Sequence, residues 1–228
     1  MYSKKIIYIL FIFICASCDV KKETGYIDEG EINYKLVYLE SDKDKPIISI
    51  LPSTMTVKFN KHFSIQKVDG WLGFFSLTGI SDYKKGKDYA LLKILEKKYI
   101  YEKNSGEGSF GYKELPGMNI KYVNETKIIA GYKCKKALIT LPDSTLDTMI
   151  VYYTDQINIK NPNWNNPFKQ INGVLLEFQM EQFNIKTKIT ANYVKSIEVP
   201  DKEFEIPSGY KRVTKREMDK VINDYGIN

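Results

Sequence analysis

The sequence predicts a mainly β protein, built as a curved antiparallel sheet that is open like a half-barrel, with one helix at its C-terminus. Alternating apolar and polar residues recur along the chain, are rich in β-branched and aromatic types, and are separated by short turn signals. The long crossovers that parallel strands require are missing from this pattern. The spacing therefore favours an antiparallel meander, open or partly closed.

Composition excludes several classes of protein. The 228 residues are 43% hydrophobic and 27% charged, which is ordinary for a globular chain and excludes a disordered or collagen-like one. Three Cys and one His exclude a disulfide framework and multi-cysteine zinc sites. The net charge of +6 comes from lysines interleaved with acids, as in 43–45, so we expect no nucleic-acid partner. We expect no metal and no cofactor.

The N-terminus predicts a lipoprotein signal peptide over residues 1–17. Lys4 and Lys5 precede an uninterrupted apolar run over 6–14, which has signal-peptide length and is shorter than the roughly 20 apolar residues of a membrane span. Small residues at 16 and 17 then precede Cys18, which resembles a bacterial lipobox, although position 15 has Cys where Leu is usual. We expect lipid attachment at Cys18; a plain secretory signal and an uncleaved anchor are the alternatives.

Residues 18–29 are predicted to be a lipidated tether, and residues 30–228 a single β-rich domain. Several acyl chains on Cys18 exceed the two signals that stable anchoring needs, so the membrane is an expected partner through this anchor. We expect the protein in the bacterial cell envelope, on the periplasmic or surface face of the outer membrane. Asp19 favours inner-membrane retention and the charged run 21–23 resembles a surface-export tag, so the leaflet stays open.

The period-two pattern predicts about ten to twelve strands. They are expected near 31–38, 55–59, 63–67, 71–77, 90–95, 99–101, 120–123, 127–129, 132–141, 148–154, 174–180 and 185–194. Asp69-Gly70 is a strong hairpin signal, and the charged run 96–98 predicts a second hairpin. Two irregular stretches, 103–117 and 160–173, exceed the usual loop length of about 4–6 residues, so they are either functional or mobile.

One helix is well marked after residue 213. Thr214 and Glu217 have the spacing of a capping box, and Met218, Val221, Ile222 and Tyr225 follow at helical spacing. Because a helix this short is marginal alone, we expect it to dock on the sheet.

The sequence motifs give only weak support for a catalytic, nucleotide-binding or calcium-binding site. Residues 106–111 match G-x-G-x-x-G, but Pro116 follows too soon for the helix that a dinucleotide site needs. Cys134 and His62 are a conceivable nucleophile and base, but a small buried side chain within a strand is the favoured interpretation of Cys134. The carboxylate pairs at 143/147 and 42/44 lack calcium-loop spacing. We expect no enzyme; an envelope hydrolase is the remaining alternative.

The aromatic content, with 17 Tyr, 11 Phe and 2 Trp, comes with strands that are apolar on both faces. Two interpretations stay open. Either a helix or loop covers the second face, or the sheet is concave and that face lines a hydrophobic cavity. The second interpretation assigns Phe74, Leu92, Tyr152, Leu176 and Phe178 to a ligand cavity.

Three segments resemble a family of envelope proteins from Bacteroidetes. Residues 128–137, IIAGYKCKKA, resemble its I-x-GY-x-CKKA segment, residues 151–157 are similar to its W/Y-Y-T strand, and residues 204–211, FEIPSGYK, are similar to its FEIPxGYK close. The related families are GLPGLI and DUF4412. Residues 171–178, INGVLLEF, depart from the GLPGLI string, which makes DUF4412 the better match.

The resemblance implies a LolA/LolB-like fold, in which a half-barrel closed by a helix or loops surrounds a cavity for acyl chains; it implies no catalytic residues. The first functional hypothesis is therefore a lipid-anchored envelope lipoprotein that binds a lipid or another hydrophobic ligand by apolar burial. The alternative is a non-enzymatic scaffold or partner-binding lipoprotein with a packed barrel, which would expose an apolar patch or a sheet edge.

Overall fold

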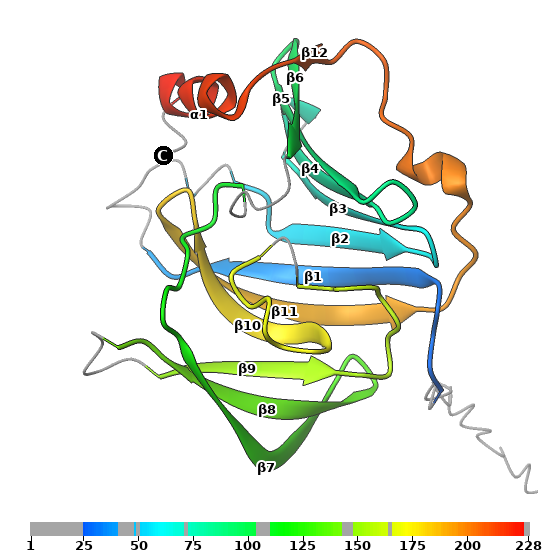
Figure 1. Cartoon of the computed structure of the whole chain (residues 1–228), viewed down its shortest axis with the longest axis vertical. Coiled ribbons are helices and arrows are strands. Elements are labelled where there is room, and N and C mark those ends of the chain that lie inside the picture. The colour runs from blue at the N-terminus through cyan, green and yellow to red at the C-terminus, as the bar shows by residue number, and fades with distance from the viewer. Residues whose placement is uncertain are drawn as a thin grey trace, which may run out of the picture.

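A computed structural model describes residues 25–40, 48, 51–70, 73–103, 110–142, 148–163 and 166–225 (Figure 1). The predicted signal peptide and Cys18 lie outside these residues. The elements are β1 (Gly30–Tyr38), β2 (Thr54–Phe59), β3 (Phe63–Asp69), β4 (Phe75–Asp82), β5 (Lys87–Ile94), β6 (Lys97–Lys103), β7 (Asn119–Ile129), β8 (Tyr132–Thr140), β9 (Met149–Thr154), β10 (Val174–Gln182), β11 (Ile185–Lys195), the 3-10 turn η3 (Asp201–Phe204), β12 (Lys211–Arg212) and α1 (Lys215–Asp224).

Within the described residues, twelve strands form one curved sheet in the order β12-β6-β5-β4-β3-β2-β1-β11-β10-β9-β8-β7. Two antiparallel meanders, β1–β6 and β7–β11, join edge to edge where β1 pairs with β11 from Glu31↔Lys195 to Tyr38↔Thr187. Only the short β12 is parallel, to β6. Because β7 and β12 end the sheet without pairing to each other, it is open, which confirms the predicted fold class (Figure 1).

The alternation that predicted the strands matches their burial. In β1, Ile32, Tyr34 and Leu36 are buried, whereas Asn33 and Lys35 between them are not. Both predicted hairpins form, as β3 pairs with β4 and β5 pairs with β6. The predicted strands 120–123 and 127–129 are instead one strand, β7, because a bulge between Val123 and Thr126 absorbs the extra residues without ending the pairing. The strand predicted from 71 begins at Phe75.

Helix α1 begins as predicted. The Thr214 side chain accepts a hydrogen bond from the Glu217 backbone N–H (3.3 Å), and the Glu217 carboxylate accepts one from the Thr214 backbone N–H (2.7 Å). Met218 and Ile222, one turn apart, are buried against β5 and β6 together with Phe110. The helix therefore docks on the sheet, which stabilises a segment too short to be helical alone.

Strand β5 is covered on both faces. Ala90, Leu92 and Ile94 pack under α1, whereas Tyr89 and Leu91 point the other way, into a second cluster. Val199 and Phe204 close that second cluster from the segment containing η3. Figure 1 shows α1 and η3 on different sides of the β3–β6 part of the sheet. The two-faced apolar pattern of this part therefore reflects two covered faces.

The second long irregular stretch packs against the rest of the sheet. Ile157, Ile159, Phe168 and Ile171, from the connection between β9 and β10, belong to the same buried cluster as residues of β1, β2 and β8–β11. Figure 1 shows this connection passing across the face of the sheet. We call residues 155–163 and 166–173 the covering loop. Its length reflects a structural role, because it supplies core residues.

The folded domain begins before the predicted boundary at residue 30. Ile27 is 6% exposed and forms a parallel bridge with Ile157 of the covering loop. Its backbone N–H donates to the Gln156 carbonyl (3.0 Å). The predicted tether is therefore shorter at its C-terminal end, because a single apolar residue within a polar stretch is too weak a pattern to predict this packing.

A buried carboxyl in the β4–β6 part gives a testable dependence on pH. Asp88 is 3% exposed, its Oδ1 has no hydrogen-bond partner within the described part of the chain, and burial raises its pKa to about 6. A hydrogen bond from Ser81 and the charge of Lys103 only partly offset this burial. The folded state thus holds a proton that the unfolded chain releases near pH 4, so stability falls as pH rises from about 4 to 6.

We expect Asp88→Asn to stabilise the protein by about 1–2 kcal/mol at pH 8, because the neutral amide avoids burying a charge. The gain should shrink towards zero at pH 4, where the carboxyl of the original protein is also neutral. Urea unfolding at both pH values measures it. A gain that does not change with pH would show that ionisation of Asp88 is not its cause.

Candidate functional site

The cavity that lies between the covering loop and the sheet is small. A cavity of about 80 Å³ remains between the covering loop and strands β1–β4. Tyr34 and Phe178 line it from the sheet, and Asn163 and Asn166 from the loop. Ligand sites usually have roughly 300–1,000 Å³, and even an engineered cavity that takes benzene has about 150 Å³. This cavity is therefore too small for an acyl chain.

A larger space opens between β9 and β10. Antiparallel pairing of these strands runs only from Val174↔Thr154 to Glu177↔Tyr152, with a register shift between Leu175 and Glu177. Beyond that point β10 continues for five residues, and β9 pairs only with β8. One edge of β10 pairs with β11. On its other edge only the end is paired, where the Lys113 backbone N–H donates to the Glu181 carbonyl (3.0 Å) and Tyr112 forms a bridge with Gln182. Figure 1 shows the two ribbons diverging. Between these two ends, backbone groups of 178–180 in β10 and of 149–151 in β9 that face each other are left without ladder partners within the described residues.

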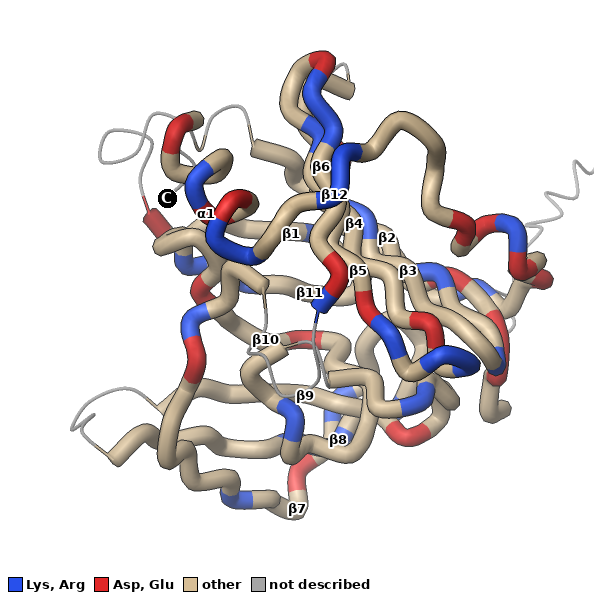
Figure 2. Tube along the Cα trace, turned by 45° about the horizontal axis from the view of Figure 1, so that its top comes forward, with Lys and Arg blue, Asp and Glu red and all other residues tan. Residues whose placement is uncertain are grey.

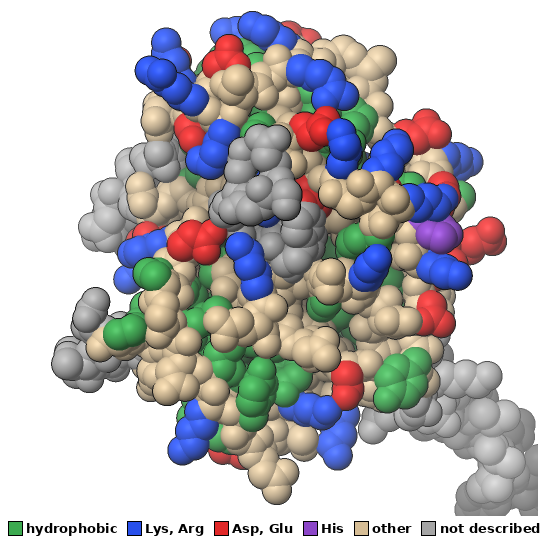
Figure 3. Space-filling model, in the orientation of Figure 1, with side chains coloured by type: hydrophobic (Ala, Val, Ile, Leu, Met, Phe, Trp, Pro, Cys, Tyr) green, Lys and Arg blue, Asp and Glu red, His purple; other side chains and the backbone are tan. Residues whose placement is uncertain are grey.

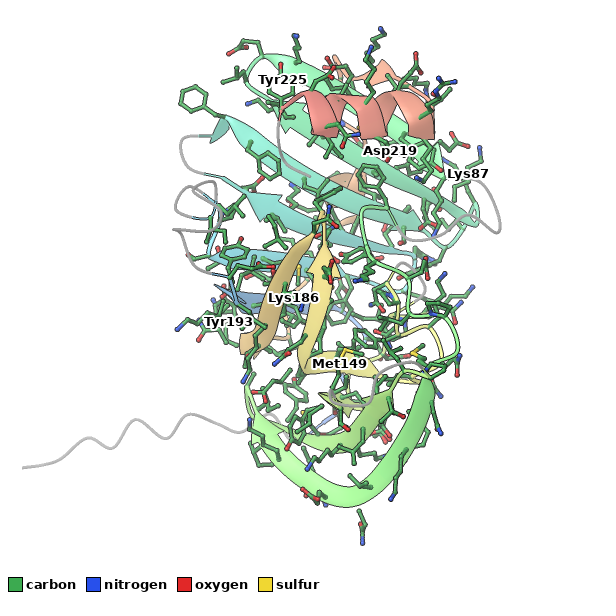
Figure 4. All side chains as sticks on the ribbon, turned by 90° about the vertical axis from the view of Figure 1, so that its left-hand side faces the viewer. Lys87, Met149, Lys186, Tyr193, Asp219 and Tyr225 are labelled. Atoms are coloured by element: carbon green, nitrogen blue, oxygen red, sulfur yellow. The ribbon has the colours of Figure 1, made fainter. Side chains whose placement is uncertain are left out.

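We call this space the β9–β10 cleft, and its volume is about 710 Å³. Figure 4 shows Met149 and Lys186 on the side of the molecule where it opens. Its apolar lining residues are Leu39, Leu115, Leu141, Met149, Ile150, Tyr152, Pro167, Phe178 and Met180, and its polar ones are Lys113, Thr148, Glu177, Gln179, Glu181, Lys186 and Lys188. Figure 3 shows apolar side chains on the lower part of the face it draws, where β9 lies. Apolar area beside charged groups suits an amphipathic ligand.

Charged side chains lie at the narrow end of the cleft, where β9 and β10 begin to separate. Glu177 pairs with Lys127 (2.9 Å) and, more loosely, with Lys188 (3.9 Å). The Lys127 ammonium also lies 5.0 Å from the centre of the Tyr152 ring. Such partly exposed pairs contribute little to stability, but together they fix the orientation of Tyr152. At the other end Lys113 pairs with Glu181 (3.2 Å).

Two of the five predicted cavity residues come together. Tyr152 and Phe178 both line the β9–β10 cleft. Leu176 is fully buried in the main core, and Leu92 is 1% exposed under α1 in a different cluster. Phe74 is 51% exposed in the turn before β4. The five therefore do not line one cavity, because the apolar second faces on which the prediction rested are covered by α1, the η3 segment and the covering loop.

Cys134 is a core side chain. It is 0% exposed, its thiol donates weakly to the Tyr132 carbonyl (3.6 Å), and burial raises its pKa to about 12. A nucleophile requires the thiolate, which is suppressed here. His62 lies in the turn between β2 and β3, and Cys134 lies in β8. The arrangement fits the structural interpretation of Cys134.

Other candidate motifs remain outside the site. The carboxylate pairs at 42/44 and 143/147 and most of the glycine-rich motif 106–111 lie outside the described residues. Gly111 is described, and its positive φ of 73° places its α-carbon against the Phe183 ring. Within the described ranges no group of three His, Cys, Asp or Glu side chains is placed to hold a metal.

Most of the cleft was missed by sequence reasoning. Met149, Ile150 and Met180 lie in predicted strands, but nothing local shows that two neighbouring strands will separate. One sequence signal could have predicted where β9 and β10 separate. It is the pair Leu175-Leu176 followed by Glu177, which breaks the period-two pattern at the position where the register shifts.

Charge is spread over the molecule. Figure 2 shows Lys and Arg interleaved with Asp and Glu along the chain, as expected for a solvated surface. Among the described residues, no helix has the length and apolar character needed to cross a bilayer.

No protein family is matched by the chain, and no curated protein matches it. Among solved structures, the chain is similar to the crystal structure of MucB, with a TM-score of 0.35 and 7% identity over 79% of this chain and 58% of that one. For MucB in complex with MucA(peri) the TM-score is 0.34 and the identity 8%, over 79% of this chain and 54% of that one. The chain thus spans less than two thirds of MucB, and a likeness of this size assigns no function.

Proposed function

We propose that this chain is a non-enzymatic binding protein of the bacterial cell envelope, anchored through a lipid on Cys18, which holds an extended segment of a partner polypeptide in the β9–β10 cleft. The observation that carries the proposal is the separation of β9 and β10 beyond Tyr152↔Glu177. It leaves two strand edges facing a cleft of about 710 Å³.

An extended peptide suits this site because its backbone offers the hydrogen-bond partners that the two strand edges lack. Its backbone N–H and C=O groups can pair with a strand edge, and its alternating side chains can reach apolar area on one side. Met149, Ile150 and Met180 supply that area. The lysines 113, 186 and 188 outnumber Glu177 and Glu181 around the cleft, so acidic side chains in the peptide are favoured.

A hydrophobic ligand is the second candidate, and the apolar lining of the same cleft favours it. An acyl chain would contact Leu115, Met149 and Phe178 by apolar burial. It would leave the strand edges without partners, which separates the two candidates experimentally. The cavity of about 80 Å³ under the covering loop is too small for either ligand.

Ile150→Glu tests the cleft with little risk to the fold, because Ile150 is 44% exposed. The probe is a fluorescent ten-residue peptide that alternates valine and glutamate, titrated by anisotropy into the full chain held in a neutral detergent. A glutamate carboxylate on the apolar lining should weaken peptide binding by about tenfold or more, equivalent to about 1.4 kcal/mol, because it repels the glutamates of the peptide and interrupts the apolar contact.

Ile128→Glu is the matched control, because Ile128 is 59% exposed on β7 and does not line the cleft. It should bind the peptide like the original protein. If only palmitate binds and Ile150→Glu weakens its binding, the hydrophobic ligand replaces the peptide as the function. If neither probe binds, or both variants behave alike, the cleft is not a binding site.

A further inference from the structure

A second hollow, of about 630 Å³, lies where four separate segments meet. Its lining residues are Asp28, Lys61, His62, Tyr83, Lys84, Asn158 and Lys160. They come from the start of the domain, the β2–β3 turn, the β4–β5 turn and the covering loop. Figure 3 shows the histidine, in purple, among lysines at the right-hand edge. We call this hollow the basic pocket.

Cations outnumber carboxylates in the basic pocket. Lys84 pairs with Asp201 (2.9 Å), which lies beside the hollow. Asp28 accepts a hydrogen bond from the Asn158 side chain (2.6 Å). Among the described residues, Lys61 and Lys160 form no ion pair. Three lysines against two carboxylates leave a net charge of about +1.

The donors converge from different directions. Lys61 and His62 are neighbours in one turn, Lys84 comes from the next turn, and Lys160 comes from the covering loop. Tyr83 adds a hydroxyl, which lies 2.8 Å from Ser64 Oγ. A phosphate group takes several hydrogen bonds on different oxygens at once, and lysine ammonium groups supply them as mobile point charges. A single carboxylate ligand would leave part of this donor set unused.

We infer that the basic pocket binds a phosphate-bearing ligand. Lys61 and Lys160 supply ammonium groups that pair with no carboxylate in the described part of the chain, and His62 and Lys84 lie beside them. The site is separate from the β9–β10 cleft, because the residues lining the two spaces do not overlap.

The phosphate has two possible sources, a phospholipid headgroup and a free phosphate in solution. Asp28 lies ten positions after Cys18, so a fully extended chain between them spans at most about 35 Å. A domain anchored at Cys18 keeps the basic pocket within that distance of the lipid headgroups. The headgroup source therefore rests on the anchor in the proposed function, whereas phosphate binding itself does not.

The single histidine makes the pocket directly observable. The chain has one His, so the imidazole C–H signals in an NMR spectrum of the full chain in neutral detergent belong to His62. Titration with inorganic phosphate should shift these signals along a saturable curve. The double variant Lys61→Gln/Lys160→Gln should weaken the affinity by about tenfold or more.

The control is Lys35→Gln/Lys220→Gln, which removes the same charge from exposed positions outside the pocket. It should leave the affinity within about twofold. A curve that does not saturate, or an equal loss in both double variants, would show general charge attraction and overturn the inference.

Lipid nanodiscs separate the two sources. The full chain is placed in nanodiscs of phosphatidylcholine, with or without phosphatidylglycerol, and no phosphate is added. A His62 shift that requires phosphatidylglycerol and is lost in Lys61→Gln/Lys160→Gln identifies the headgroup. A shift only with soluble phosphate identifies the free anion, and no specific shift in either arm rejects the site. None of these outcomes depends on peptide binding in the cleft.

Discussion

Replacing Phe168 with alanine is expected to destabilise the protein by about 3–5 kcal/mol, the range for a fully buried phenylalanine. The side chain is 0% exposed and its ring packs edge-to-face on Phe178, with ring centres 6.0 Å apart. Its removal leaves a cavity between the covering loop and the sheet that the rigid strands cannot close. Urea unfolding followed by circular dichroism measures the loss.

Phe74→Ala is the matched control, because the same atoms are removed from a side chain that is 51% exposed. Its cost should stay below about 1 kcal/mol. The variant Phe168→Ala should also gain binding of a small apolar probe such as benzene, since the new cavity joins the existing space of about 80 Å³. Equal costs for the two variants would mean that the covering loop does not supply core.

Asn163→Ala is expected to cost about 2–4 kcal/mol, because two buried carbonyls lose their donor. The Asn163 side-chain N–H groups donate to the Ile171 carbonyl (2.7 Å) and the Gly173 carbonyl (2.8 Å). The residue is 3% exposed, so water cannot readily replace the lost bonds. These bonds close the covering loop upon itself, and the variant should therefore also loosen the loop, which limited proteolysis detects.

Asn163→Asp sharpens this prediction, since it keeps the shape and removes the donors. At pH 7 a carboxylate beside two carbonyl oxygens should cost at least as much as alanine. Asn192→Ala is the control, because Asn192 is exposed on β11 and makes only a long side-chain contact with Asn33 (3.5 Å). An Asn163→Asp protein as stable as the original would contradict the assigned hydrogen bonds.

Local patterns predicted local structure well. Alternation predicted β1, the Asp69-Gly70 signal predicted the β3–β4 hairpin, and the Thr214 and Glu217 spacing predicted the start of α1. Each depends on residues close in sequence, whose geometry is set by backbone periodicity or by one turn. The union of two meanders through β1 and β11 was not predictable, because the paired residues lie more than 140 positions apart.

The candidate site shows the same limit. Apolar residues on both faces of a strand show that both faces are covered, but not what covers them. Leu92 is buried under α1 and Leu176 is buried in the main core, whereas Tyr152 and Phe178 border open space. The difference arises from where β9 and β10 separate and from where the covering loop packs. Both are tertiary events that leave only the interrupted alternation at Leu175-Leu176 in the sequence.

Hydrogen exchange tests the central claim most directly. Amide exchange of the full chain is compared with and without a saturating peptide of alternating valine and glutamate. We expect protection at the amides of Met149–Val151 in β9 and Phe178–Met180 in β10 that point into the cleft, since successive amides of a strand face opposite edges and the others already pair with β8 or β11. Protection confined to the covering loop, or none at a peptide concentration that gives binding, would contradict binding in the β9–β10 cleft.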